Sequence, residues 1–155
     1  MAKRSRAREV ALQLLFQHDH NLRVDRSRIE SFVRGRLRDP LLEAFCLSLY
    51  DGVVAKQGDI DLRVAEAAEN WRLPRMAAVD RNVLRLGAYE ILYHPETPPN
   101  VVFDEAIELA RRYGSQDSSA FVNGVLDKLR QSAVSSTPSL PAGDVGSIAG
   151  QADPS

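Results

Sequence analysis

Apolar residues recur three and four positions apart along most of this 155-residue chain, whereas strict alternation of apolar and polar residues is absent. That spacing is typical of amphipathic α-helices, in which such residues share one face, and not of β-strands. The sequence therefore predicts an all-α fold of about seven helices. The expected helices cover about residues 5–19, 25–37, 39–58, 60–70, 77–93, 101–113 and 118–131.

Residues with special backbone preferences mark several of the expected helix ends. Asp39 followed by Pro40 is typical of a helix start, because aspartate caps free backbone N–H groups and proline fits the first turn. Gly58 is expected to end that helix and Asp59 to begin the next. The proline-rich segment 94–100 cannot be helical throughout, because proline lacks a backbone N–H and restricts its neighbours.

The break near Gly58 divides the expected helices into two packed subdomains, about residues 5–58 and 60–131. After Gln131 the composition changes to mostly Ser, Ala, Gly and Pro. Such a segment buries too little apolar surface to offset the entropy lost on ordering. We therefore expect one helical domain over residues 1–131 and a disordered tail over residues 132–155.

Positive charge gathers at the start of the chain, although the whole chain has a formal charge of −1. Without Lys3, Arg4, Arg6 and Arg8 the remainder carries −5. A local basic cluster on an acidic body is typical of a place where a polyanion docks.

The other compositional features predict a cytoplasmic protein. A single cysteine, Cys46, cannot form a disulfide within the chain, which fits a reducing compartment. No run of apolar residues is long and uninterrupted enough for a secretory signal or a membrane span.

Residue patterns that support catalysis are missing, so we expect neither an enzyme nor a cofactor or metal site. There is no glycine-rich phosphate loop. His18 and His20 are two positions apart and would point away from each other on a helix. Cys46 falls on the apolar stripe of its helix, which indicates a buried, inert thiol. Asp59 and Asp61 flank a helix start, where capping explains acidic residues.

Two aromatic residues leave alternatives open. On the first helix, Phe16 falls nearly opposite the apolar stripe, so it either packs under another helix or forms a stacking platform for an unpaired base. Arginines in the preceding turns lie within reach of the phosphates that would flank such a base. For Trp71, packing at a junction between helices is the favoured interpretation over ligand stacking.

Several blocks of the sequence resemble the NusB family of bacterial transcription antitermination factors. The blocks occur in the family's order and cover most of residues 4–131. They are ARE-VALQLLFQ (7–17), Trp-Arg-Leu (71–73), AVDRNVLRLGAYEIL (78–92), VVFDEAIELARRYG (101–114) and SSAFVNGVLDKL (118–129).

The resemblance implies an all-helical, non-catalytic protein of two packed subdomains. Such a protein binds the boxA element of nascent ribosomal RNA leaders with NusE, a small-subunit ribosomal protein, and helps to load an antitermination complex onto RNA polymerase. In the resemblance, Asp80 faces the NusE partner and the RNA. The implied RNA contacts are Lys3, Arg4, Arg6, Arg8, Phe16, Arg85, Tyr113, Asp117 and Phe121.

Two positions depart from the family's pattern. Phe16 stands where some members carry tyrosine, so a ring remains for stacking but a hydroxyl hydrogen bond is lost. Ala120 stands where some members carry lysine, which removes one phosphate partner. RNA affinity without NusE is therefore expected to be modest.

Three other functions compete with RNA binding. A protein-interaction module that hides its basic arm in a homodimer is one, since some family members pair. A helper acting in trans for ribosomal RNA modification is another, because NusB-like domains also precede the catalytic domains of certain ribosomal RNA cytosine methyltransferases. Helix-turn-helix DNA binding ranks last, because no short pair of helices carries a basic recognition face.

Overall fold

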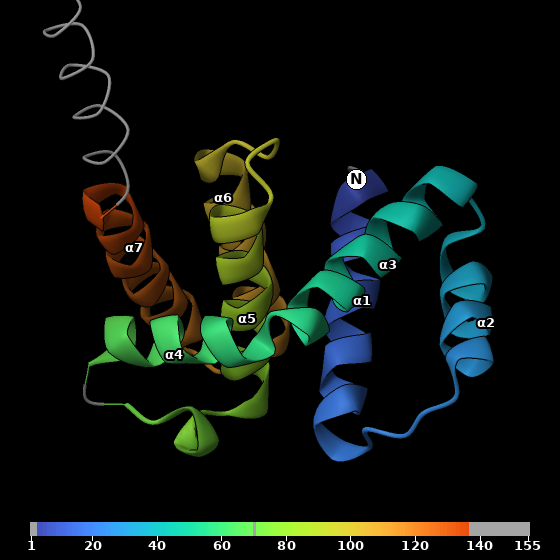
Figure 1. Cartoon of the computed structure of the whole chain (residues 1–155), viewed down its shortest axis with the longest axis horizontal. Coiled ribbons are helices and arrows are strands. Elements are labelled where there is room, and N and C mark those ends of the chain that lie inside the picture. Colours follow the sequence, from blue (N-terminus) through green and yellow to red (C-terminus); the bar gives the residue numbers. More distant parts are fainter. Residues whose placement is uncertain (1–2, 70, 137–155) are drawn as a thin grey trace, which may run out of the picture.

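A computed structural model describes residues 3–69 and 71–136, and within them the chain is all-α, as predicted (Figure 1). No strand occurs in these residues. None of their helices is long and apolar enough to span a membrane. The helices are α1 (Lys3–His20), α2 (Arg26–Leu37), α3 (Pro40–Ala55), α4 (Gln57–Ala68), α5 (Ala78–Tyr93), α6 (Pro99–Tyr113) and α7 (Ser118–Ser136), with a 3-10 turn at Leu73–Arg75.

The helices form two packed groups that share one core. Helices α1, α2 and α3 contact one another, and α4, α6 and α7 gather around α5 (Figure 1). Helix α5 also contacts α1 and α3, so it joins the two groups. Buried apolar residues from both groups belong to a single cluster. The expected pair of packed helical subdomains is therefore present.

The apolar stripes predicted from the spacing are the buried faces of the helices. On α1 and α7 the predicted stripes are buried: Ala7, Val10, Ala11, Leu14 and Leu15 on α1, and Val122, Val125, Leu126 and Leu129 on α7. Cys46 is buried in the same core, and this burial raises the pKa of its thiol to about 12. The thiol is therefore protonated and unreactive at neutral pH.

The helix boundaries agree with the sequence signals at one junction and differ at another. The Asp39 carboxylate accepts hydrogen bonds from the backbone N–H groups of Leu41 and Leu42, at 3.0 and 3.4 Å, ahead of Pro40. Gly58, in contrast, does not end a helix. It lies in the first turn of α4, because only Lys56 separates α3 from α4.

Helix α7 continues past Gln131 to Ser136, so residues 132–136, which we assigned to the tail, are helical. Neither glycine nor proline interrupts these five residues, and the next proline is Pro138. The rest of the predicted tail lies outside the described residues.

Ion pairs below the surface join α1 to α5 at both ends of α1. Near its start, the Arg8 guanidinium donates two hydrogen bonds to the Glu90 carboxylate, at 2.8 and 2.9 Å, and both side chains are almost fully buried. Near its end, Asp19 accepts from Arg81, Asn82 and Arg85 on α5. These pairs fix the direction of α1 relative to the second group of helices.

We predict that Glu90→Leu lowers the free energy of unfolding by about 3–5 kcal/mol, because it leaves the buried Arg8 without its main carboxylate. Urea denaturation followed by circular dichroism measures the change. The double variant Arg8→Met with Glu90→Leu should recover most of the loss, since an apolar pair carries no uncompensated charge. A single variant as stable as the wild type would contradict the role given to this pair.

Candidate nucleic-acid interface

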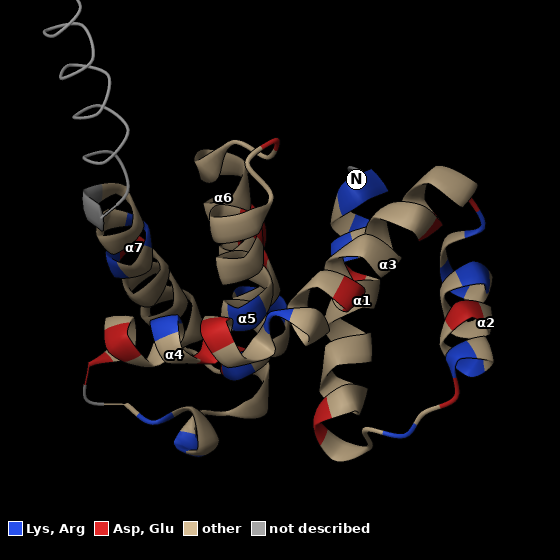
Figure 2. Ribbon diagram, in the orientation of Figure 1, with Lys and Arg blue, Asp and Glu red and all other residues tan. Residues whose placement is uncertain are grey.

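The first turns of α1 present cations at the surface beside α3 (Figure 2). Lys3 and Arg4 are exposed, and the Cζ of Arg4 lies 4.2 Å from the centre of the Phe45 ring, in a cation–π contact. Cations at this end of a helix face the positive end of its dipole, and the first turn contains no acidic residue to balance them. An anion bound at this position would therefore be favoured by both the side chains and the helix.

Arg8 departs from the arrangement that the resemblance implied. Its residue surface is 3 % exposed, and its guanidinium lies between Glu90 and, at 3.9 Å, Glu105. Burial acts to lower the pKa of Arg8, but the hydrogen bonds and charge of Glu90 outweigh it and raise the pKa. Arg8 therefore stays charged inside the protein, where it holds α1 on α5 and α6 instead of extending towards solvent.

Arg85, also expected at the RNA, is likewise engaged below the surface. It donates to both oxygens of Asp61, at 2.8 and 3.0 Å, and to Asp19 at 2.8 Å. These three residues tie α4, α5 and the end of α1 together. The geometry gives Arg85 a positioning role within this network.

Phe16 and Tyr113 line one groove, although they are far apart in the sequence. The groove has a volume of about 230 Å³ and is otherwise lined by Leu12, Gln13 and Val79. Phe16 is 38 % exposed and Tyr113 is 41 % exposed, so both rings are accessible at its rim. Of the two alternatives for Phe16, partial exposure beside a second aromatic ring favours the stacking platform.

The Glu9 carboxylate organises the polar rim next to this groove. It accepts hydrogen bonds from the Tyr113 hydroxyl, from Arg112 at 2.9 Å and from Arg6 at 2.5 Å. Burial acts to raise the pKa of Glu9, but the hydrogen bonds from Tyr113, Arg6 and Arg112 lower it overall. Burial and the same carboxylate raise the pKa of the Tyr113 hydroxyl. Two guanidinium groups and an oriented tyrosine are thus brought together.

Arg112 was not among the residues expected from the sequence. It is charged, partly exposed and adjacent to Tyr113, and it joins Arg6 at the groove because Glu9 binds both. The only signal for it was a pair of arginines at the end of the sixth helix, Arg111 and Arg112.

The structure separates Asp117 and Phe121 from the lining of this groove. Asp117 is exposed just before α7. Phe121 is partly buried, and its ring meets the edge of Trp71 with the ring centres 5.6 Å apart. Trp71 therefore contacts α7 through Phe121, while 54 % of its surface stays exposed.

Two buried acceptor atoms have no hydrogen-bond donor among residues 3–69 and 71–136. They are Oδ1 of Asp80, in the first turn of α5, and Oε1 of Gln13, in the groove wall. A buried acceptor without a donor costs about 1–3 kcal/mol.

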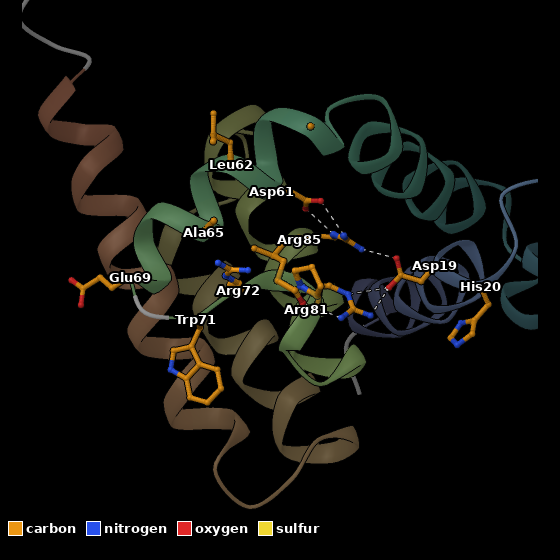
Figure 3. Close-up of a pocket in the computed structure, with 13 residues that line it drawn as sticks. Asp19, His20, Asp61, Leu62, Ala65, Glu69, Trp71, Arg72, Arg81 and Arg85 are labelled. Carbon is orange, nitrogen blue, oxygen red and sulfur yellow. Dashed lines mark hydrogen bonds and ion pairs between the residues drawn. The ribbon is translucent and has the colours of Figure 1, made fainter.

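A second and larger cleft, of about 880 Å³, lies between the end of α1, α4 and the segment 71–74 (Figure 3). Four of its lining residues form an ion-pair network, in which Arg85 donates to Asp19 and Asp61 and Arg81 donates to Asp19. Leu62, on its α4 side, is 60 % exposed, and Trp71 lies at the other side. Exposed apolar side chains around a cleft are typical of a protein-docking surface.

Comparison with known proteins identifies relatives along nearly the whole helical part. The NusB family model matches residues 5–131. The transcription antitermination protein NusB of Sorangium cellulosum (strain So ce56) is 46% identical over 131 residues, which cover 84% of this chain and 94% of that protein. The protein of the same name from Myxococcus xanthus (strain DK1622) is 40% identical over 133 residues, covering 83% and 95% of the two chains.

Solved structures show the same fold. NusB of T. maritima is 36% identical, with a TM-score of 0.73 over 83% of this chain and 90% of that one. In a crystal structure of the antitermination factors NusB and NusE in complex with double-stranded RNA, one chain is 25% identical, with a TM-score of 0.76 over 85% and 98% of the two chains.

We predict that Glu9→Gln lowers the free energy of unfolding at pH 7 by about 1.5–3 kcal/mol, since it removes charged hydrogen bonds to Arg6 and Arg112. Because the folded protein holds the pKa of Glu9 below its ordinary 4.5, this stabilisation is present above pH 4.5 and is lost as the pH falls through the folded value.

The measurement is urea denaturation of both proteins at a series of pH values down to about 3. The difference between them should shrink as the pH falls. Glu66→Gln is a matched control, because Glu66 is exposed and has no ion-pair partner among the described residues. A constant difference at every pH would contradict the assignment.

Proposed function

The chain belongs to the NusB family, and from this premise we propose that it is a transcription antitermination factor that binds boxA-type single-stranded RNA of ribosomal RNA leaders together with NusE. It acts as a binding factor, without catalysis, in the assembly of an antitermination complex on RNA polymerase. Because the protein acts on nascent bacterial RNA, we expect it in the cytoplasm.

The proposal of RNA binding rests on the aromatic groove and on the cations beside it. Unpaired bases stack on Phe16 and Tyr113, which both line the groove and are partly exposed. Stacking on an aromatic side chain is worth about 1–3 kcal/mol per base. A groove with two such rings suits single-stranded RNA, whose bases are free to stack.

Phosphates flanking these bases bind the exposed cations. Lys3 and Arg4 lie at the start of α1, and Arg6 and Arg112 lie beside Tyr113. Arginine suits this role because its planar guanidinium pairs with phosphate through two hydrogen bonds. Arg8 and Arg85 contribute indirectly, because their buried ion pairs hold α1, and hence Phe16, in place.

The start of α7 supplies a further contact. The exposed Asp117 carboxylate accepts hydrogen bonds from the amino groups of bases. Phe121 supports this end of the helix through its contact with Trp71. Tyr113 fits base stacking together with Phe16 better than Phe121 does, because Tyr113 lines the same groove.

NusE docks on the side of the larger cleft. Leu62 and Trp71 offer apolar surface there, and Asp80, in the first turn of α5, is the partner contact that the family resemblance implies. RNA specificity is then shared between the two proteins. The alternative is a self-associating module whose basic arm is hidden in a homodimer, and the molar mass in solution distinguishes the two.

We predict that Phe16→Leu weakens binding of a boxA-like RNA by about 5- to 150-fold without changing its salt dependence, since a stacked base is lost but no charge is removed.

Lys3→Gln with Arg4→Gln should weaken binding to every RNA and flatten the plot of log Kd against log salt concentration by about 0.7 per lost phosphate contact.

Fluorescence anisotropy with boxA-like and scrambled RNA, with and without NusE, at two salt concentrations, tests both expectations. Phe103→Leu is the matched control, because Phe103 is partly buried on α6 and does not line the groove. Unchanged affinity in all variants, or equal binding of both RNAs with NusE present, would contradict the proposal.

A further inference from the structure

Helix α2 and its flanking segments carry a second concentration of arginine, in addition to the cations of α1 (Figure 2). Residues 23–38 contain six arginines and two carboxylates, a net charge of +4. With α1 included, residues 3–38 hold ten of the twenty cations and four of the twenty-one carboxylates of the chain, so this part carries +6 and the rest −7. The charge division therefore follows the fold, with α1 and α2 positive.

Among the arginines of residues 23–38, only Arg26 forms ion pairs with carboxylates of the described residues. It pairs with Asp51, at 2.7 and 2.9 Å, and with Glu30 at 3.1 Å. The nearby carboxylates are engaged in turn, since Asp25 accepts from Ser27 and Asp39 caps α3. The remaining arginines are exposed and have no carboxylate partner within the described residues. They are Arg23, Arg28, Arg34, Arg36 and Arg38. Arg23 and Arg28 line the cleft described below, and Arg36 packs on Phe32, which also lines it, so we name these three the α2 face.

The α2 face borders a polar cleft between the end of α1 and α2. The cleft has a volume of about 560 Å³, and Arg23, Arg28, Asn21 and Gln17 contribute to its lining, together with one acidic residue, Asp25. Gln17 directly follows Phe16, so neighbouring residues of α1 line the cleft and the aromatic groove. Arg36 extends the same edge of α2, with its guanidinium 4.6 Å from the centre of the Phe32 ring.

These features favour a nucleic-acid backbone as the occupant. Arginine guanidinium groups and amide side chains are the groups that bind phosphate and sugar oxygens. A membrane surface does not fit, because the apolar residues of α2, Ile29 and Val33, are buried in the core and unavailable for insertion.

We propose that the α2 face is a second RNA-binding surface, which holds the phosphates of RNA that continues beyond the segment bound in the aromatic groove. This inference rests on the proposed function, because it extends the path of the same RNA. A longer RNA would then gain affinity without additional base-specific contacts, and this gain would depend strongly on salt.

The experiment compares a minimal boxA-like RNA with two longer RNAs, extended by about 10 nucleotides on the 5′ or on the 3′ side, a length within the roughly 4–16 nucleotides that one single-stranded binding unit covers. Anisotropy at several salt concentrations gives Kd and its salt slope for each RNA. The variant is Arg23→Gln with Arg28→Gln. The control is Arg63→Gln with Arg130→Gln, which removes the same charge from α4 and α7.

We expect one extended RNA to bind the wild type more tightly than the minimal RNA does, with a steeper salt slope. The α2 variant should lose this gain and flatten the slope by about 1.4, for two phosphate contacts at about 0.7 each, while it binds the minimal RNA as the wild type does. The control should keep the gain.

Three results would overturn the inference while the proposed function stands: no gain from either extension, a gain that persists in the α2 variant, or an equal loss in the control. A loss in the α2 variant of NusE binding alone would also overturn it and would assign the surface to a protein. Failure of the wild type to bind the minimal RNA would contradict the proposed function itself.

Discussion

The attachment of α1 to α5 by ion pairs at both ends is the constraint on which the rest of the structure depends. Arg8 with Glu90 holds the start of α1, and Asp19 with Arg81 and Arg85 holds its end. Buried charges are costly unless they are paired with good geometry, and Arg8 donates two hydrogen bonds to Glu90 while its Nη1 lies 3.9 Å from Glu105. Because α1 is fixed in this way, Phe16 on one group of helices meets Tyr113 on the other at a single groove.

Burial decides what each arginine does in this protein. Arg8 and Arg85 are enclosed by carboxylates and hold helices together. Arg6 and Arg112 share Glu9 at the rim of the groove, where a guanidinium stays within reach of solvent. Arg4 and the α2 face are exposed and free of carboxylates within the described residues. Arginine thus has three roles here: it joins helices, it orients the polar groups beside the groove, and it provides the charge proposed to attract RNA.

Local sequence signals predicted the helices and one residue of the groove. The spacing of apolar residues placed the seven α-helices of the described residues and the buried stripe of α1. The outward position of Phe16 on that helix marked it as unusual, whereas Tyr113 was expected only from the family resemblance. The glycine signal failed at one helix boundary. Gly58 was expected to break a helix, but it lies in the first turn of α4.

Pairing between distant residues could not be predicted in the same way. Glu90 lies 82 positions from Arg8, and nothing in the N-terminal segment indicates that the fourth of its cations is buried. The contact of Arg112 with Glu9 and the place of Gln13 in the groove likewise depend on how α1, α5 and α6 pack together. The arginines of α2 were visible in the sequence, but their significance depends on the cleft that α2 forms with α1.

Chemical-shift mapping by NMR, with the labelled protein titrated with a short boxA-like RNA, tests the central claim most directly. The account predicts the largest changes at the rings of Phe16 and Tyr113 and at the side chains of Arg6 and Arg112, with little change at the buried guanidinium groups of Arg8 and Arg85. Changes confined to the cleft beside Trp71, with the signals of Phe16 and Tyr113 unmoved, would contradict it.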